Sequence, residues 1–270
     1  MSNTRSARRT PVTTSLLILC TVIFLCVNFL PLKISEGSRI ILFGAYYKTF
    51  MIAGEWWRLL TVGLVHYSLW HLAMNMMSLI NLGRFLELQL GSRRFLSVLA
   101  MSTIGGSLFL FASKGNTIAV GLSGGLYGLL GFMLLVMFKN GSLKHPVFRA
   151  YMIRMIVVNL TINLLPGIAY MAHLGGFLTG VLCALVLSED PDIRKIRIHT
   201  LIASLILAGF LGYRVSQKMY IRTDERYLGT DIEVLRTYRD LGLRNYSMYI
   251  AEKIDAQYDT IYLETALEEE

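Results

Sequence analysis

Charged residues are scarce in this sequence of 270 residues: Asp, Glu, Lys and Arg together make up 16%, whereas soluble domains usually contain about a quarter. Hydrophobic residues make up 54%, and the mean hydropathy is +0.52. A composition this apolar excludes disordered and collagen-like chains. It indicates a protein of the lipid bilayer.

Cysteine is also rare. The chain has three cysteines, Cys20, Cys26 and Cys183, and all of them lie inside apolar runs. Small secreted proteins built on disulfides are much richer in cysteine. We therefore expect no disulfide.

The net charge of +8 conceals two regions of opposite sign. Residues 1–217 contain 19 Lys and Arg against 6 Asp and Glu, and residues 218–270 contain 7 against 12. A basic protein can bind nucleic acid, but these cations are spread over short segments between apolar runs and form no single basic patch. We expect no nucleic-acid partner.

Seven apolar segments have about the length that a helix needs to cross the hydrocarbon core. The run from Leu59 to Leu90 is too long for one span, and Glu55-Trp56-Trp57-Arg58 before it is typical of a membrane interface. We therefore assign residues 33–66 to a long, partly embedded loop. The predicted spans are Val12–Leu30, Tyr67–Leu86, Phe95–Ala112, Thr117–Phe138, Val147–Leu165, Gly167–Leu187 and Ile198–Val215.

The cations predict the orientation of these spans. No small-residue cleavage site follows the first run, so we interpret it as a retained helix and not as a signal peptide. By the positive-inside rule, the set of short loops that is richer in Lys and Arg is cytoplasmic. This places the N-terminus inside and the acidic tail outside. With no transit peptide recognised, we expect a bacterial plasma membrane. The cytoplasmic set comprises Arg5, Arg8, Arg9, Arg84, Arg93, Arg94, Lys139, Lys144, Arg149, Arg194, Lys195 and Arg197.

These segments define the predicted organisation of an all-α polytopic membrane protein. Its parts are a cytoplasmic N-terminus (1–11), a six-helix membrane core (12–187), a cytoplasmic loop with a seventh transmembrane helix (188–217), and an acidic extracytoplasmic tail (218–270). The tail contains many tyrosines among its charges and predicts a small helical appendage. Because it offers no catalytic group, we expect truncation after Lys218 to leave activity intact.

Polar residues inside spans are costly, so each is a candidate for function, although many only join helices through hydrogen bonds. His71 and Asn75 lie four residues apart on one face of the second span. Ser123 lies among glycines in the fourth span, and His173 lies near the start of the sixth. Taken singly, each fits helix packing as well as chemistry.

The topology brings these residues to one depth. The second, fourth and sixth spans all begin at the outer face, and His71, Ser123 and His173 each lie one to two turns from that end. A nucleophile, a base and an amide donor at one depth suit acyl transfer. Ser123 would attack, His173 would take its proton, and Asn75 with the Ser123 N–H would hold the oxyanion.

Other protease chemistries lack their residues. No predicted span contains an aspartate, which excludes an intramembrane aspartic protease, and His71 does not belong to the His-Glu-x-x-His motif of metalloproteases. Glu87 lies near the cytoplasmic end of its span, too far away to complete a Ser-His-Asp-type triad. A Ser-His dyad is the remaining possibility.

Five motifs follow one another in the sequence: Trp57-Arg58, His66 with His71-x-x-x-Asn75, Gly83-x-x-x-Glu87-x-x-x-Gly91, Gly121-Leu122-Ser123-Gly124 and Ala172-His173-x-x-Gly176-x-x-x-Gly180. On these motifs, residues 12–187 resemble the rhomboid intramembrane serine proteases. The resemblance implies a six-helix core, Ser123 as nucleophile, His173 as base, and an oxyanion site formed by His71, Asn75 and the Ser123 amide. It also implies that Tyr127 packs against the His173 ring, and that Glu87 and Arg58 are structural.

Two features depart from the family pattern. Val120 stands where some members have glycine, which narrows the wall beside the oxyanion site. The seventh span and the tail exceed the six-helix core and resemble the six-plus-one arrangement of some members.

The sequence therefore predicts a membrane serine endopeptidase that cleaves transmembrane segments of other proteins, without metal or organic cofactor. Its partners are transmembrane substrates and the bilayer, and its oligomeric state stays open. A catalytically inactive rhomboid-like scaffold is the alternative, although such relatives lose the serine or the histidine and this chain has both Ser123 and His173. A transporter with a histidine proton relay would need polar groups along a crossing path, whereas these candidates cluster at one depth.

Overall fold

The computed structural model of the chain describes residues 9–113, 117–188, 191–216, 227–258 and 262–268. This part is mostly helical, with one pair of two-residue strands. The elements are α1 (Pro11–Phe29), α2 (Glu36–Leu42), β1 (Tyr46–Tyr47), α3 (Lys48–Ile52), α4 (Arg58–Thr61), α5 (Leu69–Ser78), the π-helix η1 (Leu79–Gly83), α6 (Arg84–Leu90), α7 (Ser92–Ala112), β2 (Ile118–Ala119), α8 (Ser123–Lys139), the 3₁₀-helix η2 (Ser142–Lys144), α9 (Pro146–Asn163), α10 (Tyr170–Leu187), α11 (Pro191–Ser216), α12 (Leu228–Asp240), α13 (Arg244–Tyr258) and α14 (Tyr262–Glu268).

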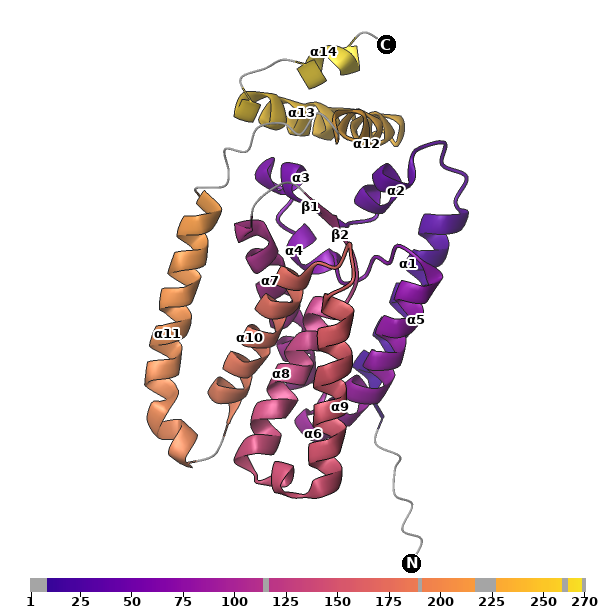
Figure 1. Cartoon of the computed structure of the whole chain (residues 1–270). Coiled ribbons are helices and arrows are strands. Elements are labelled where there is room, and N and C mark those ends of the chain that lie inside the picture. The colour runs from indigo at the N-terminus through magenta and orange to yellow at the C-terminus, as the bar shows by residue number, and fades with distance from the viewer. Residues whose placement is uncertain (1–8, 114–116, 189–190, 217–226, 259–261, 269–270) are drawn as a thin grey trace, which may run out of the picture.

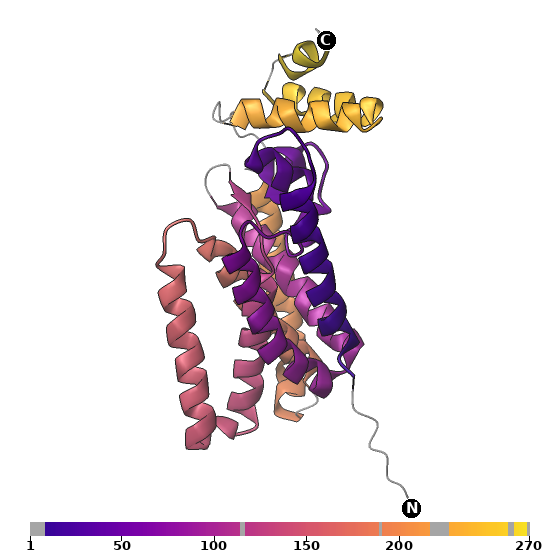
Figure 2. The same ribbon diagram turned by 90° about the vertical axis from the view of Figure 1, so that its right-hand side faces the viewer.

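Three helices form the centre of the bundle. Helix α10 packs along both α7 and α8, and α7 also packs against α8. Helix α11 runs beside α10 on one side, and α1 and α5 lie on the other (Figure 1). Helix α9 stands apart from the bundle along most of its length, as Figure 2 shows. Helices α7, α8 and α10 therefore form the centre of the bundle, whereas α9 is peripheral.

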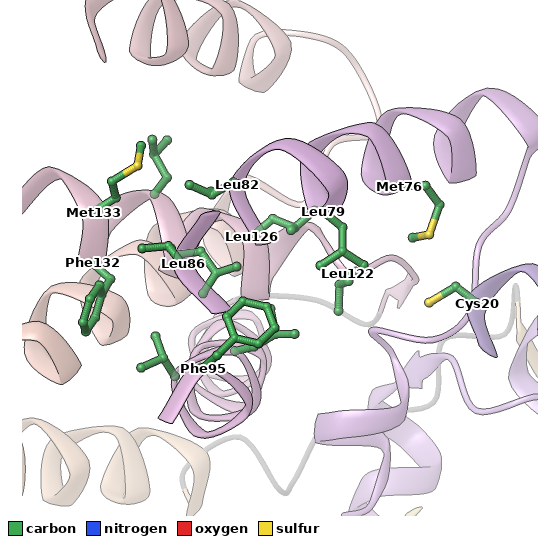
Figure 3. Packing of buried hydrophobic residues seen from close by; sticks show 14 of the residues in the cluster. Cys20, Met76, Leu79, Leu82, Leu86, Phe95, Leu122, Leu126, Phe132 and Met133 are labelled. Atoms are coloured by element: carbon green, nitrogen blue, oxygen red, sulfur yellow. The ribbon is translucent and has the colours of Figure 1, made fainter. Parts of the chain in front are cut away.

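The hydrophobic core joins the central helices to the helices on the α5 side. Figure 3 shows its side chains meeting from α1, α5, η1, α6, α7 and α8. Such interlocking apolar side chains hold membrane helices together by van der Waals packing, because lipid offers no hydrophobic driving force. The labelled members are Cys20, Met76, Leu79, Leu82, Leu86, Phe95, Leu122, Leu126, Phe132 and Met133.

The apolar helices correspond to the predicted spans. Among the described residues, α1, α7 and α10 are long and apolar enough to cross a membrane, and α8 and the Ile198–Tyr213 part of α11 are apolar but shorter. The predicted second span corresponds to α5, η1 and α6, which follow one another without a break, and the fifth corresponds to α9.

The predicted start of the fourth span at Thr117 is wrong. Helix α8 begins at Ser123, six residues later, because Ile118–Ala119 form β2 instead. Strand β2 pairs antiparallel with β1, with Tyr46 opposite Ala119 and Tyr47 opposite Ile118. The long loop thus holds the segment that leads into α8, and Ser123 becomes the first residue of the helix.

The loop of residues 33–66 is ordered around a buried ion pair. Arg58 and Glu55 are both fully buried and paired with each other. The Arg58 guanidinium also donates to the carbonyl oxygens of Ile41 at 2.6 Å and Ala45 at 2.9 Å. A charge buried with partners on several sides fixes the path of the chain around it. Arg58 is structural, as the family resemblance implied.

The tail is helical, as expected, but it is no independent appendage. Helices α12, α13 and α14 lie across the end of the bundle, over α2 and α3 (Figure 1). Val234, Leu235 and Ile254 of the tail share one buried apolar cluster with Ile41 and Phe50 of the loop. The tail therefore packs on the loop, in a cluster separate from the hydrophobic core of the membrane helices.

Glu87 joins α6 to the start of α1. Its carboxylate accepts hydrogen bonds from the backbone N–H of Val12 at 2.9 Å and of Thr13 at 2.8 Å, and from the Ser92 hydroxyl at 2.7 Å. A carboxylate suits free N–H groups at a helix N-terminus. Glu87 thus has a structural role here, and this end of α1 lies opposite the tail (Figure 1). Arg5 and Arg8 of the predicted cytoplasmic terminus lie outside the described residues.

Candidate active site

Ser123 occupies the first position of α8 and is half-buried. The turn before it is held by the Gly121 N–H, which donates to the Val62 carbonyl of the long loop at 2.9 Å. Gly121 has φ +112°, a conformation that residues with a Cβ rarely adopt. Because the first N–H groups of a helix have no acceptor within it, the backbone around Ser123 offers free donors.

His173 lies in the first turn of α10 and is buried. Its Nε2 is 2.8 Å from the Ser123 Oγ, so the serine hydroxyl and the imidazole form a direct hydrogen bond across 50 residues of sequence. A nucleophile and a base within this reach satisfy the geometric requirement of a Ser-His pair. The structure thus brings these two candidates together.

The pair meets because α8 and α10 approach at backbone distance. A Cβ on Gly176 would overlap the carbonyl of Gly124, and a Cβ on Gly180 would overlap the carbonyl of Gly128. Small residues four apart allow this approach in membrane helices. The close glycine packing expected from both motifs is confirmed.

Tyr127 lies one turn after Ser123 and stacks on the His173 ring. The two ring centroids are 4.1 Å apart and the rings are nearly parallel, with an interplanar angle of 6°. The contact that the resemblance implied is therefore present. It holds the imidazole plane but does not set the rotation of the ring within that plane.

Asn163, at the end of α9, is a residue that the sequence reasoning missed. Its Oδ1 is 2.7 Å from His173 Nδ1, on the far side of the ring from Ser123. The rule that selected His71 and Asn75, a polar residue inside an apolar span, also applies to Asn159 and Asn163, which are four residues apart. That spacing was the available signal.

His71 and Asn75 lie on the other side of Ser123, against the Gly121 turn. A Cβ on Gly121 would lie 2.6 Å from His71 Cε1 and 3.7 Å from Asn75 Nδ2. Asn75 is buried, and its Nδ2 donates to the His71 carbonyl within α5 at 2.9 Å. The two predicted oxyanion residues thus face the turn that leads to Ser123, with the amide of Asn75 engaged in its own helix.

A cavity of about 340 Å³ connects these groups. Its wall includes side chains of α5, α8, α9 and α10, among them His71, Asn75, Ser123 and His173. Val120, the departure from the family pattern, also lines it. The cavity runs between α5 and α9, and Trp70 at the start of α5 is 75% exposed beside it. Ser123 therefore lies on the wall of a cavity between these helices.

Comparison with known proteins identifies relatives in plants and bacteria. RHOMBOID-like protein 5 of Arabidopsis thaliana is 38% identical over 153 residues, covering 55% of this chain and 50% of that protein. Rhomboid protease GluP of Bacillus subtilis (strain 168) is 33% identical over 193 residues, covering 68% and 38%. Inactive RHOMBOID-like protein 8 of Arabidopsis thaliana is 34% identical over 154 residues, covering 56% and 44%.

The chain spans half or less of the length of these three relatives. The family model described as the Rhomboid domain matches residues 53–190, about half of the chain, and this match includes Ser123, His173, His71 and Asn75. It also includes Asn163 and the glycines of the α8–α10 contact. The chain therefore belongs to the rhomboid family.

Proposed function

We propose that the protein is an intramembrane serine endopeptidase that cleaves transmembrane segments of other membrane proteins. The observation that carries this proposal is the 2.8 Å hydrogen bond between Ser123 Oγ and His173 Nε2, placed at the wall of a cavity. One relative is named a rhomboid protease and another an inactive rhomboid-like protein, so membership alone does not decide activity. The presence of both residues in bonding contact favours the protease over the inactive scaffold.

In the proposed reaction Ser123 Oγ attacks the scissile carbonyl carbon while its proton passes to His173 Nε2. The tetrahedral intermediate then expels the amine, which takes the proton from His173, and an acyl-enzyme remains on Ser123. Water activated by His173 cleaves that ester, releases the carboxylic acid and restores the serine. Each proton that His173 accepts is returned within the same half-reaction, so the cycle balances.

The developing oxyanion needs donors on the side of Ser123 away from His173. The Ser123 N–H at the start of α8 is one, and His71 and Asn75 beside Gly121 supply side-chain donors. Asn75 Nδ2 donates one hydrogen to the His71 carbonyl, and its second hydrogen remains for the oxyanion. Catalytic hydrogen bonds often tighten only once substrate is present.

For the membrane topology we propose seven crossings, by α1, the continuous α5–η1–α6 unit, α7, α8, α9, α10 and α11. The start of α1 and the tail helices lie at opposite ends of the bundle (Figure 1), which supports an odd number of crossings. The loop cations then place the N-terminus in the cytoplasm and the tail outside. The bacterial plasma membrane stays a prediction, because the relatives come from a plant as well as a bacterium.

Labelling with a fluorophosphonate tests the proposal. An activated serine reacts far faster than an ordinary hydroxyl, so we expect the label on Ser123. Ser123→Ala should abolish labelling and cleavage of a transmembrane substrate in liposomes, and His173→Ala should suppress both. Ser97→Ala, which removes an exposed hydroxyl of α7, is the matched control and should change neither. An unlabelled Ser123, together with no cleavage of the substrate by the wild type, would leave the scaffold as the better function.

A further inference from the structure

The end of α9 presents a connected set of polar groups to His173. Asn163 Oδ1 lies 2.7 Å from His173 Nδ1, and Asn163 Nδ2 lies 2.7 Å from the Tyr127 hydroxyl. The Tyr127 hydroxyl in turn donates to the Asn159 carbonyl at 2.9 Å, and this carbonyl also accepts from Asn163 Nδ2 at 2.9 Å. Asn163 therefore contacts both the imidazole and the tyrosine that stacks on it.

These bonds determine which way the Asn163 amide points. The Tyr127 hydroxyl has one proton, which it gives to the Asn159 carbonyl, so toward Asn163 it must accept. The group of Asn163 that faces Tyr127 is then the NH₂, and the group that faces His173 is the carbonyl oxygen. A carbonyl oxygen can only accept, so His173 Nδ1 carries the hydrogen.

The tautomer that follows is the one a general base needs. With the hydrogen on Nδ1, the neutral ring has its lone pair on Nε2, where Ser123 Oγ lies at 2.8 Å. When His173 takes the serine proton, the imidazolium still donates from Nδ1 to Asn163. The same bond sets the ring rotation that stacking on Tyr127 leaves free.

A neutral amide suits this location better than a carboxylate. Asn163 lies in a predicted span, where an ionised side chain carries a large desolvation cost. An amide supplies the acceptor for Nδ1 without that charge, as in the Cys-His-Asn arrangement of some soluble proteases. Ser123, His173 and Asn163 thus form a chain of hydrogen bonds that contains no acidic residue.

Helix α9 is otherwise loosely attached. Met152 is its one buried residue, and the helix stands apart from α8 and α10 along most of its length (Figure 2). The amide of Asn163 therefore reaches His173 from a peripheral helix, and the orientation of the base depends on where α9 sits.

We propose that Asn163 is a positioning residue that completes a Ser123–His173–Asn163 chain by fixing the tautomer and rotation of His173. This role rests on the proposed protease function. Asn163 contacts His173 at Nδ1, on the side of the ring away from Ser123, so its removal should lower the rate of the chemical step and leave substrate binding alone.

Three variants test this role. Asn163→Leu keeps the side-chain volume without hydrogen bonds, Asn163→Asp keeps an oxygen acceptor for Nδ1, and Thr161→Val changes an exposed position on the same helix as the control. We expect Asn163→Leu to lower kcat and the fluorophosphonate labelling rate of Ser123 together by about 10-fold to 100-fold, with KM close to the wild type. Asn163→Asp should recover part of both rates, and Thr161→Val should match the wild type.

The outcomes separate the two proposals. If Ser123 of the wild type is not labelled and the wild type does not cleave the substrate, the protease function fails and the role of Asn163 with it. If the wild type is labelled and Asn163→Leu labels equally fast, only the positioning role is overturned. A purely structural role would raise KM or lower the melting temperature in both Asn163 variants without recovery in Asn163→Asp, and that result would also overturn it.

Discussion

The membrane core around Ser123 and the tail with its loop are both buried, but by opposite means. In the core, α8 and α10 meet through glycines, and backbone lies against backbone. At the tail, large polar side chains fill the contact: Tyr246 Oη donates to Glu55 Oε1 at 2.7 Å, and Arg58 Nη2 donates to Tyr238 Oη at 3.1 Å. The α8–α10 contact excludes side chains and so brings Ser123 and His173 together, whereas the tail uses paired side chains to hold a loop.

This difference teaches where each kind of substitution acts. We expect a change at the α8–α10 contact to alter the distances between Ser123, His173 and their neighbours, and through them the proposed chemical step. We expect a change at the tail to alter the stability of the loop of residues 33–66. This loop holds the segment before α8, because its strand β1 pairs with β2. If this division holds, substitutions near Ser123 lower kcat, and substitutions at the tail lower the melting temperature.

The largest effect is expected from His173→Ala, which removes the proton acceptor for Ser123. In serine proteases, loss of one member of the pair lowers kcat by about 10⁶-fold. We expect a comparable loss in a liposome cleavage assay, with hydrogen exchange of the α12 amides unchanged because the described tail helices pack over α2 and α3. Altered exchange in α12 would show that the two regions are coupled, and the comparison would break.

Asn75→Ala should have the next largest effect. Loss of one oxyanion donor lowers kcat by about 10²-fold to 10³-fold, and His71 beside it can soften the loss. Asn81→Ala, at an exposed position of the same continuous helix, is the control and should cleave at the wild-type rate. Equal rates for both variants in detergent would assign Asn75 to helix packing alone.

Leu235→Ala should act on stability. Leu235 is fully buried in the apolar cluster between tail and loop, and truncating such a leucine costs about 2–5 kcal/mol. We expect a lower melting temperature with a kcat near that of the wild type when cleavage is measured below the transition. Leu241→Ala removes a leucine that is 61% exposed just after the same helix, and it should leave the melting temperature unchanged.

Truncation after Lys218 extends the same test, although Lys218 itself lies outside the described residues. Removal of the tail takes away Tyr238 and Tyr246, which bond Glu55, and uncovers Phe50. We therefore expect a larger fall in melting temperature than for Leu235→Ala, with cleavage retained at low temperature. Loss of cleavage in a folded truncated protein would mean that the tail also controls the site.

The smallest expected effect is a pH dependence of tail docking. Burial raises the pKa of Asp231 to about 7, and the hydrogen bond from Tyr47 Oη at 2.6 Å opposes this only in part. The docked tail binds this proton more tightly than an undocked tail, so docking is strongest at low pH and weakens as the pH rises toward the raised pKa.

The measurement is the melting temperature between about pH 5 and pH 8. Asp231→Asn cannot ionise and keeps an acceptor for Tyr47, so its melting temperature should fall less across this range. Asp240→Asn, at an exposed position of the same helix, should follow the wild type. If the melting temperature of the wild type falls no more than that of Asp231→Asn across this range, the proposed titration is contradicted.

Much of the membrane region could be predicted from composition and spacing. Long apolar runs must be helical in lipid because every backbone N–H and C=O needs a partner within the segment. Glycines four residues apart in two runs indicated close packing, and the family motifs implied the stacking of Tyr127 on His173, both of which the structure shows. The catalytic roles of Ser123, His173, His71 and Asn75 stay predictions until activity is measured.

Only the tertiary structure decided the contacts between segments that are far apart in the chain. Strand β2 replaces the start of the predicted fourth span because Ile118 and Ala119 find partners in Tyr47 and Tyr46, some 70 residues earlier. The tail became part of a buried cluster, and Asn163 became a partner of His173, for the same reason. Local periodicity reports which residues prefer lipid or a helix, but it carries no information on which distant polar group will satisfy another, because that choice depends on how the helices pack.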